Sequence, residues 1–272
     1  MNYKLLIPKG IKPFLKKVHY QYLLNNPFRG AVPPAHAVFI GNGDFEAVGE
    51  LLMRSFVNEG GLKSHHKVLD VGCGMGRAAL PMVNFIDAKA GGSYDGFDIV
   101  WRGIEWCQKK YKQFTHFKFV HADVYNMHYN PQGRNKSREY RFPYADNTFD
   151  FVLLTSVFTH MLPADVENYL REIARVMKPE ATCFITYFIM NPESRALIEQ
   201  GKMQQNFDFK HNHGDYSVVF ETDPEYAVGF ELAYLQKIYD SSGLNIQTPI
   251  LYGAWSGRDP HYSFQDVVIA KK

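Results

Sequence analysis

The sequence predicts an α/β fold, a doubly wound and mostly parallel sheet of seven strands that ends in an antiparallel strand. Three observations carry this prediction. An apolar strand runs into a glycine-rich turn, VLDVGCGMGR, at 68–77. Strand-like and helix-like segments then alternate to residue 188, as in parallel sheets covered by helices on both faces. Only residues 253–263 separate the strand-like segments 246–252 and 264–270, too few for a helical crossover, so these two should pair antiparallel.

The other elements follow from local patterns. We expect a helix over 14–24, then a Pro/Gly-rich stretch over 27–43 and a helix over 45–57, where apolar residues return at helical spacing. The glycine turn leads into a helix over 78–85, whose first turns tolerate Pro81. Further strands are expected over 94–100, 117–121, 149–154 and 183–188, and further helices over 103–112, 163–177 and 230–241.

We divide the chain into an N-terminal extension or cap, 1–45, and one domain over 46–272. Within that domain the segments 124–145 and 191–229 are longer than the sheet requires. Long insertions in compact domains often serve as lids or binding loops. Both should lie at the carboxyl edge of the sheet, where folds of this class bind ligands.

Composition and charge limit the class of function. With 272 residues and 46% hydrophobic content, the chain can bury a large core. A formal net charge of +2 argues against a nucleic-acid binder that works by bulk electrostatics. The charge is unevenly placed, because no acidic residue precedes Asp44. Basic residues in that stretch are Lys4, Lys9, Lys12, Lys16, Lys17 and Arg29. We therefore expect a weak contact of the N-terminus with an anionic surface.

The cysteines and the N-terminal sequence indicate the cellular compartment in which the protein is expected. Cys73, Cys107 and Cys183 are far apart and form no C-x-x-C, so we expect a reducing, cytoplasmic location without disulfides or a bound metal. Apolar stretches near the N-terminus are short and broken by Pro8 and Pro13, and we expect neither a signal peptide nor a transmembrane segment.

The glycine spacing selects a ligand. Gly72, Gly74 and Gly76 give G-x-G-x-G with Asp70 two residues ahead, whereas Arg77 breaks the G-x-G-x-x-G of dinucleotide sites. Glycines in such a turn let a ligand lie against backbone N–H groups. For Asp70, the alternative to contact with the ligand is a purely structural role, in which its side chain orders the turn.

Two more acidic residues end the next two strands. Asp98 can accept hydrogen bonds from both hydroxyls of a ribose. Asp123 can accept from the exocyclic amine of an adenine, with the backbone N–H of Val124 beside it. The alternatives are a surface acid at a strand end for Asp98 and a turn-capping residue for Asp123.

This pattern resembles class I S-adenosylmethionine (SAM) dependent methyltransferases. The resemblance runs from about residue 45 to 188, and is broadest in FPYADNTFDFVLLTSVFTHM at 142–161 and YLREIARVMKPEATCFITYF at 169–188. Glu180 and Ala181 depart from it, because many relatives have glycines there. The stretches VFIGNGDFEAVGE and YGAWSGR resemble a bacterial subgroup of largely unassigned substrate. The family resemblance implies SAM as cofactor and S-adenosylhomocysteine (SAH) as product. The expected cofactor-binding residues are Asp70, Val71, Gly72, Cys73, Gly74, Gly76, Asp98, Ile99, Asp123, Val124 and Thr155.

Two residues are candidates for catalysis. His160 follows the fourth strand closely, and an imidazole with a pKa near roughly 6.5 suits a general base at neutral pH. The alternative is a helix-entry residue. Tyr187 could line the acceptor pocket or simply pack. Polar and aromatic residues on loops of the same edge form the expected acceptor site: His211, His213, Tyr216, Trp255, Arg258, His261 and Tyr262.

The leading functional hypothesis is a SAM-dependent methyltransferase that acts at an oxygen of a small molecule or glycan. N-methylation of a small molecule or peptide, and a non-catalytic SAM-binding partner subunit, are the alternatives. Nucleic acid is disfavoured as acceptor, because TSVF at 155–158 replaces the Pro-Pro-aromatic device of base N-methylation and no Pro-Cys pair is present. A nicotinamide-dependent oxidoreductase is disfavoured by Arg77 and the lack of Tyr-x-x-x-Lys.

Overall fold

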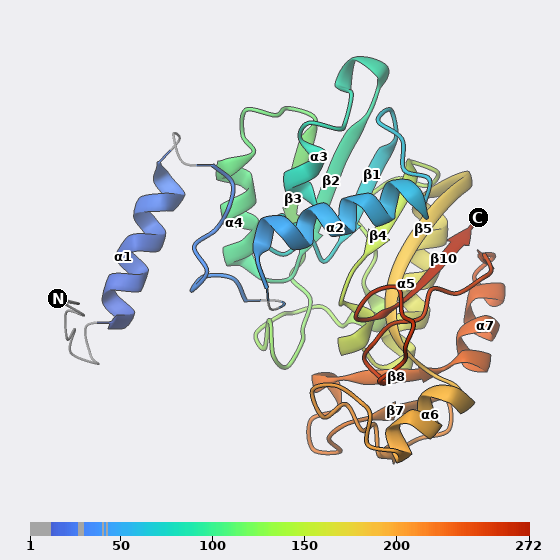
Figure 1. The fold of residues 1–272 in the computed structure, drawn as a ribbon. Coiled ribbons are helices and arrows are strands. Elements are labelled where there is room, and N and C mark those ends of the chain that lie inside the picture. The colour runs from blue at the N-terminus through green and yellow to red at the C-terminus, as the bar shows by residue number, and fades with distance from the viewer. Residues whose placement is uncertain (1–11, 27–29, 40, 42) are drawn as a thin grey trace.

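Five parallel strands form the centre of the fold (Figure 1). The computed structural model describes residues 12–26, 30–39, 41 and 43–272. The order of the central strands is β3 (Phe117–His121), β2 (Ser93–Asp98), β1 (Lys67–Val71), β4 (Phe149–Leu154) and β5 (Met177–Met190). Since β1 lies in the middle and the order reverses between β1 and β4, the turn after β1 lies at the crevice where doubly wound folds bind ligands.

The terminal antiparallel pairing is confirmed. Strand β10 (Asp266–Lys271) pairs antiparallel with β5, from Asp266 opposite Tyr187 to Lys271 opposite Thr182. Strand β9 (Asn245–Ile246) pairs antiparallel with β10. The predicted strand 246–252 was too long: beyond β9 it contributes only a bridge between Leu251 and Val267. Pro249 has no N–H to donate to a ladder, which explains the interruption.

The expected number of strands was wrong, because the sheet has ten strands in the described residues rather than seven. The insertion at 191–229 and the residues after it provide β6 (His211–Asn212), β7 (Tyr216–Val218) and β8 (Val228–Glu231). β8 pairs parallel with residues 188–190 of β5, beyond the stretch that pairs with β10. The 14-residue length of β5 leaves residues 188–190, beyond the stretch paired with β10, to pair with β8. This insertion therefore extends the sheet.

Helices cover both faces of the sheet. α5 (Pro163–Val176) and α7 (Leu232–Ser241) pack into one buried cluster, together with Leu69, Val71 and Val152. α1 (Lys12–Asn25), α2 (Phe45–Asn58), α3 (Ala79–Met82) and α4 (Trp101–Lys110) pack into the other, with Val68 and Phe151. Alternate strand residues thus enter opposite layers, as strand geometry requires. α6 (Pro192–Glu199) lies in the insertion after β5.

Apart from the strand predicted over 246–252, most predicted boundaries hold within a few residues, with three further differences. The helix expected over 78–85 is the single turn α3. The strand expected over 183–188 is longer at both ends. The helix expected from residue 230 begins at Leu232, because Phe230 belongs to β8. Lys4, Lys9 and Arg29 of the basic N-terminal stretch lie outside the described residues.

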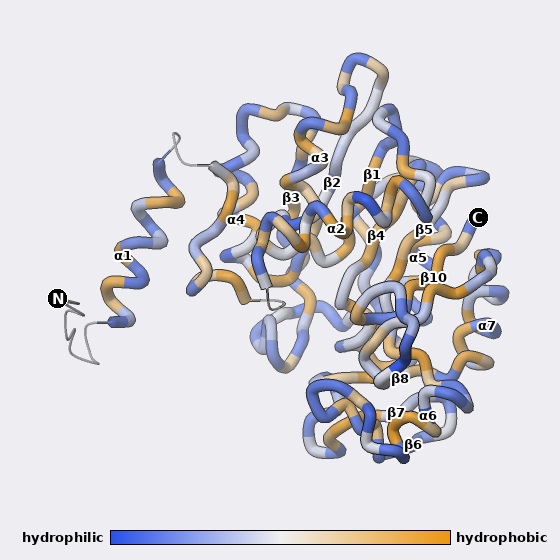
Figure 2. The backbone as a smooth tube through the Cα atoms, viewed as in Figure 1, coloured by the Kyte–Doolittle hydropathy of each residue, from blue (hydrophilic) through white to orange (hydrophobic). Residues whose placement is uncertain are grey.

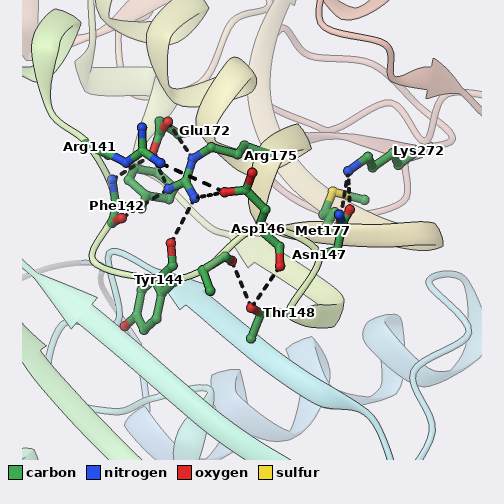
Figure 3. A network of polar contacts seen from close by, with 11 residues as sticks. Arg141, Phe142, Tyr144, Asp146, Asn147, Thr148, Glu172, Arg175, Met177 and Lys272 are labelled. Atoms are coloured by element: carbon green, nitrogen blue, oxygen red, sulfur yellow. Dashed lines mark hydrogen bonds and ion pairs between the residues drawn. The ribbon is translucent and has the colours of Figure 1, made fainter.

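A polar network fixes the end of the first insertion to α5 (Figure 3). The guanidinium of Arg175 donates to Glu172, to Asp146 and to the carbonyl oxygens of Phe142 and Tyr144. Glu172 in turn accepts from the backbone N–H of Phe142 at 2.7 Å. One turn earlier on α5, Asn168 donates to the carbonyl oxygens of Ser137 and Tyr140. The second half of the insertion is therefore a fixed wall of the fold.

None of the helices in the described part of the chain has the length and apolar character needed to cross a bilayer. The three cysteines are free and buried.

Candidate functional site

The turn after β1 is held open by its glycines. Gly72, Gly74 and Gly76 have φ angles of +82°, +56° and +82°, in the region that favours glycine. A Cβ atom at Gly72 would lie 2.3 Å from Cγ2 of Val157, so a side chain there would collide with the segment after β4. The turn is tied to β2 by the N–H groups of Gly72 and Cys73, which both donate to the carbonyl oxygen of Phe97.

Asp70 carries a buried polar atom without a partner. Its Oδ2 accepts from the hydroxyl of Tyr94, whereas no hydrogen bond reaches its buried Oδ1. Burial raises the pKa of Asp70 to about 7, and the nearby carboxylate of Asp98 adds to the increase. An unpaired buried acceptor is costly, so the site suits a ligand that brings a donor or a positive charge to Asp70.

Asp98 joins the end of β2 to the glycine turn. Its Oδ2 accepts from the N–H of Gly74 at 2.8 Å, and its Oδ1 accepts from the N–H of Val100 at 2.7 Å. Burial raises the pKa of this carboxyl, while the two backbone N–H groups act in the opposite direction. A carboxylate oxygen can accept more than one hydrogen bond, so both oxygens of Asp98 can still accept hydrogen bonds from ligand hydroxyls.

A pocket of about 600 Å³, a volume that includes its open mouth, begins at this turn. Its walls come from the ends of β1 and β2, the first insertion, η3 (Phe158–His160) and α5. The lining residues are Val71, Gly72, Phe97, Asp98, Ile99, Val100, Val124, Asn126, Tyr129, Ser137, Ser156, Val157, His160, Met161 and Tyr169. Five expected cofactor residues thus line it together with His160: Val71, Gly72, Asp98, Ile99 and Val124.

Other expected cofactor residues lie next to this lining. Asp70, Cys73, Gly74 and Gly76 belong to β1 and its turn, whereas Thr155 directly precedes the lining residue Ser156. Ser156 itself has a φ of +57°, which a non-glycine residue rarely adopts, and its N–H donates to Thr186. Such backbone strain often occurs at binding sites.

Asp123 already has a partner in the structure. Its carboxylate forms an ion pair with Arg134, which lowers the pKa of Asp123. The Arg134 side chain is 87% exposed, so this pair lies in water and contributes little to stability. Asp123 does not line the pocket, although its neighbour Val124 does. An adenine at Asp123 must therefore share this carboxylate with Arg134 or displace Arg134 from it.

His160 lines the pocket in a defined tautomer. Its Nδ1 lies 3.0 Å from the carbonyl oxygen of Glu225, and because a carbonyl only accepts, Nδ1 carries the proton. The lone pair of the neutral ring is then on Nε2. Burial lowers the pKa of His160, so the ring is neutral at pH 7. The ring of Tyr129 packs edge-on against it at a centroid distance of 5.7 Å.

The two insertions meet beside His160. Oε2 of Glu225 accepts from the side-chain amide of Asn126 and from the N–H of Met127, both at 2.9 Å. Nε2 of His128 lies 2.7 Å from Oδ1 of Asp223. Glu225 lies in η4 (Pro224–Tyr226), so this short helix holds the first insertion through a side chain and His160 through a carbonyl. We call these contacts the insertion latch.

Tyr187 does not belong to the site. The structure places it in the core, with its hydroxyl 2.9 Å from the hydroxyl of Tyr239, and burial raises its pKa far above the usual value. Tyr187 does not line the pocket, so we withdraw it as a catalytic candidate. Its apolar neighbours on β5 explain the burial: a long central strand is covered on both faces.

The expected acceptor residues lie elsewhere. Trp255 is 1% exposed, and its indole N–H donates to the carboxylate of Asp266. The guanidinium of Arg258 donates to Glu193 and lies over the ring of Tyr252. His211 and His213 both lie 3.3 Å from Glu221, with Tyr216 stacked on His213. No cluster of three or more metal-binding side chains occurs among the described residues. The structure brings none of these residues into the pocket, and His261 and Tyr262 do not line it either.

Sequence reasoning missed nine of the lining residues: Phe97, Val100, Asn126, Tyr129, Ser137, Ser156, Val157, Met161 and Tyr169. Asn126, Tyr129 and Ser137 lie in the first insertion, which was expected to form a lid, but nothing in their order marks them individually. Tyr169 lies on the apolar stripe of α5, where its spacing indicates core packing. Only their three-dimensional proximity assigns them to the pocket.

Comparison with known proteins identifies the domain around this pocket. Residues 69–185 match a family model described as a methyltransferase domain. A sterol 24-C-methyltransferase of Aspergillus fumigatus is 30% identical over 145 residues, which cover 50% of this chain and 33% of that protein. The chain spans between a third and a half of the length of the curated relatives it matches.

Solved structures share the fold. A SAM-dependent methyltransferase of Methanosarcina mazei superposes with a TM-score of 0.51 at 17% identity, covering 79% of this chain and 96% of that one. A 1,6-didemethyltoxoflavin-N1-methyltransferase of Burkholderia thailandensis, solved with bound 1,6-didemethyltoxoflavin and SAH, gives a TM-score of 0.51 at 14% identity and covers 100% of this chain and 93% of that one.

Proposed function

We propose that the chain is a class I SAM-dependent methyltransferase, which transfers a methyl group from SAM to a hydroxyl of a small-molecule or glycan acceptor. The observation that carries the proposal is that Asp98 and His160 line one pocket at the switch point of the sheet, with the unpartnered carboxylate oxygen of Asp70 in the strand beside that lining. The substrate is proposed from this pocket, since the relatives are distant and longer.

The residues of the turn fit the cofactor of this family. The unpartnered Oδ1 of Asp70 suits the amino group of the methionine part, and the carboxylate of Asp98 suits the two ribose hydroxyls. The N–H groups of Gly72, Cys73 and Gly76 donate to backbone carbonyl oxygens and that of Gly74 donates to Asp98, so these hydrogen bonds fix the shape of the turn. SAM supplies a methyl group already activated by the positive sulfonium. The protein must therefore bind and orient both reactants, exclude water and remove a proton where the acceptor needs it.

His160 supports oxygen as the acceptor atom. A hydroxyl must lose its proton as the methyl group is transferred, whereas a neutral amine can react through its lone pair. Nε2 of a neutral His160 can take that proton, because Nδ1 is held by the Glu225 carbonyl. N-methylation of a small molecule or peptide remains the runner-up, and it does not need His160. We place the protein in the cytoplasm, because three free buried cysteines suit a reducing compartment.

Calorimetry with SAH and SAM tests the binding part of the proposal, and Asp98→Ala is the variant that should lose it. A screen of hydroxylated and amine acceptors with methyl-labelled SAM tests the reaction. Binding without transfer to any acceptor would favour the alternative of a non-catalytic SAM-binding subunit. The parent protein failing to bind SAH would overturn the proposal as a whole.

A further inference from the structure

The helix α1 has two apolar sides, and only one of them is packed. Tyr20 and Leu24 are buried and belong to the same core cluster as α4. The hydroxyl of Tyr20 donates to the carbonyl oxygen of Arg102, and the ring of Tyr20 lies 5.7 Å from that of Trp106. Figure 1 shows α1 at the outer margin of the molecule, next to α4. This inner side fixes the helix to the domain.

The opposite side of α1 is exposed and apolar. Phe14, Val18 and Tyr22 follow one another at intervals of four residues, with Leu15 beside them, and their exposed fractions are 65%, 49%, 56% and 42%. At 3.6 residues per turn, the centre of this outer stripe lies about half a turn away from Tyr20 and Leu24. Figure 2 shows apolar and polar residues alternating along the helix. Isolated exposed apolar residues are common, whereas a contiguous stripe indicates a binding surface.

Positive charge borders the outer stripe. On the helical projection, Lys17 lies beside Phe14 on one margin and Lys12 beside Leu15 on the other, with Lys16 further round. All three lysines are exposed, and the sequence has no acidic residue before Asp44. A helix whose apolar stripe is flanked by lysines has the character of helices that lie in a membrane interface. Lysine side chains can reach outward to headgroups while their stems lie on the apolar layer.

We propose that α1 docks the protein on an anionic lipid bilayer through Phe14, Leu15, Val18 and Tyr22, with Lys12, Lys16 and Lys17 contacting the headgroups. Charge selects this occupant. If α1 of a second copy packed on the stripe, lysines would face lysines without a carboxylate on either helix, which is unfavourable. A nucleic acid would leave the apolar centre of the stripe without a partner. An anionic bilayer satisfies both the apolar stripe and its charged margins.

The inference is independent of the methyl-transfer proposal, because none of these residues lines the pocket. The experiment uses the full chain and sedimentation with vesicles of phosphatidylcholine, with or without phosphatidylglycerol. We expect binding to the vesicles that contain phosphatidylglycerol and weak binding to the neutral ones. Raising the salt concentration should reduce binding, because the lysine contacts are screened.

A matched pair of variants separates the stripe from general charge. Val18→Asp puts a carboxylate into the outer stripe, whereas Gln236→Asp puts the same carboxylate on an exposed position of another helix, α7. Val18→Asp should weaken vesicle binding about tenfold more than Gln236→Asp. Both variants should keep the parent's melting temperature and SAH affinity. Should Val18→Asp lower the melting temperature, Phe14→Ser at the most exposed position replaces it.

Three results would overturn the proposal: equal binding to neutral and anionic vesicles, equal effects of Val18→Asp and Gln236→Asp, or no vesicle binding by the parent. In the last case, analytical ultracentrifugation would reveal whether the outer stripe forms a dimer contact, which would make a second copy its occupant.

Discussion

Asp98 accepts a hydrogen bond from the backbone N–H of Gly74 at 2.8 Å, so one buried carboxylate fixes the end of β2 to the turn after β1. This contact links the shape of the turn to the residue proposed to hold the ribose. A substitution at Asp98 therefore affects both the ligand and the turn that receives it.

Asp98→Ala should weaken SAH binding about 10- to 100-fold, because it removes an acceptor that is charged and buried. Asp98→Asn keeps one acceptor oxygen and should lie between Ala and the parent. Calorimetry measures both. Asp95→Asn is the control, because Asp95 lies on the same strand but does not line the pocket. An SAH affinity unchanged in Asp98→Ala would remove Asp98 from the site.

Asp70 makes SAH affinity depend on pH. The pKa of Asp70 in the folded protein is about 7, above its ordinary value, so folding favours the protonated carboxyl. The contribution of this protonated group to the free energy of unfolding is complete below about pH 4 and is lost as the pH rises through 7. A ligand ammonium beside Oδ1 would favour the ionised form. SAH should therefore bind more tightly at pH 8 than at pH 6, with proton release on binding at the lower pH.

Calorimetry in two buffers of different ionisation enthalpy measures that proton release. Asp70→Asn should abolish both the release and the pH dependence of affinity between pH 6 and 8. The same pH dependence in Asp70→Asn as in the parent would contradict the assignment of Asp70 to the ligand amino group.

The insertion latch provides a prediction about the pocket's wall. Glu225→Ala leaves Asn126 and Met127 without their acceptor, so residues 126–130 should exchange amide hydrogens faster and SAH should bind several-fold more weakly. Glu221→Ala is the matched control: Glu221 lies on the same insertion but contacts His211 and His213 away from the pocket. Hydrogen exchange read by mass spectrometry separates the two. Equal exchange at 126–130 in both variants would show that Glu225 does not hold this segment.

Most of the central sheet was predictable from sequence because its strands are short runs between turn signals; β5, with 14 residues, was predicted only in part. Phe117–His121 and Phe149–Leu154 match their expected bounds. Strand β8 was not predictable, because Val228 to Glu231 merges with the helical pattern that follows and pairs with a segment far away in sequence. Long-range pairing leaves no local signal, and this explains why the strand count failed.

The same distinction applies to the site. The glycine turn and Asp98 were predictable because a local motif specifies their positions. The acceptor residues proposed from loops were not, because a loop's aromatic residues can turn inward: Trp255 packs with Phe188 and Phe209 and donates to Asp266. Polar or aromatic character on a loop does not reveal which side of the sheet edge the loop covers.

Tyr187→Phe separates the core role from the expected catalytic one. Removing the hydroxyl leaves Tyr239 without its buried partner, which should lower the free energy of unfolding by about 1–2 kcal/mol. SAH affinity and methyl transfer should stay at parental levels. Chemical denaturation and the transfer assay measure these quantities, and a large loss of transfer at parental stability would restore Tyr187 as a catalytic candidate.

His160 provides the sharpest test of hydroxyl methylation. Burial lowers its pKa, so the neutral base should already dominate at pH 7, and the transfer rate should rise with pH only below about 6.5. His160→Gln and His160→Ala should slow transfer to a hydroxyl acceptor by about 10²–10⁴-fold while SAH affinity changes little. The measurement is transfer of labelled methyl from SAM at saturating concentration across pH 5 to 8. If both variants transferred at the parental rate, His160 would be only a wall of the pocket. Transfer to an amine acceptor that survives these substitutions would then favour N-methylation, because an amine lone pair reacts without prior proton removal.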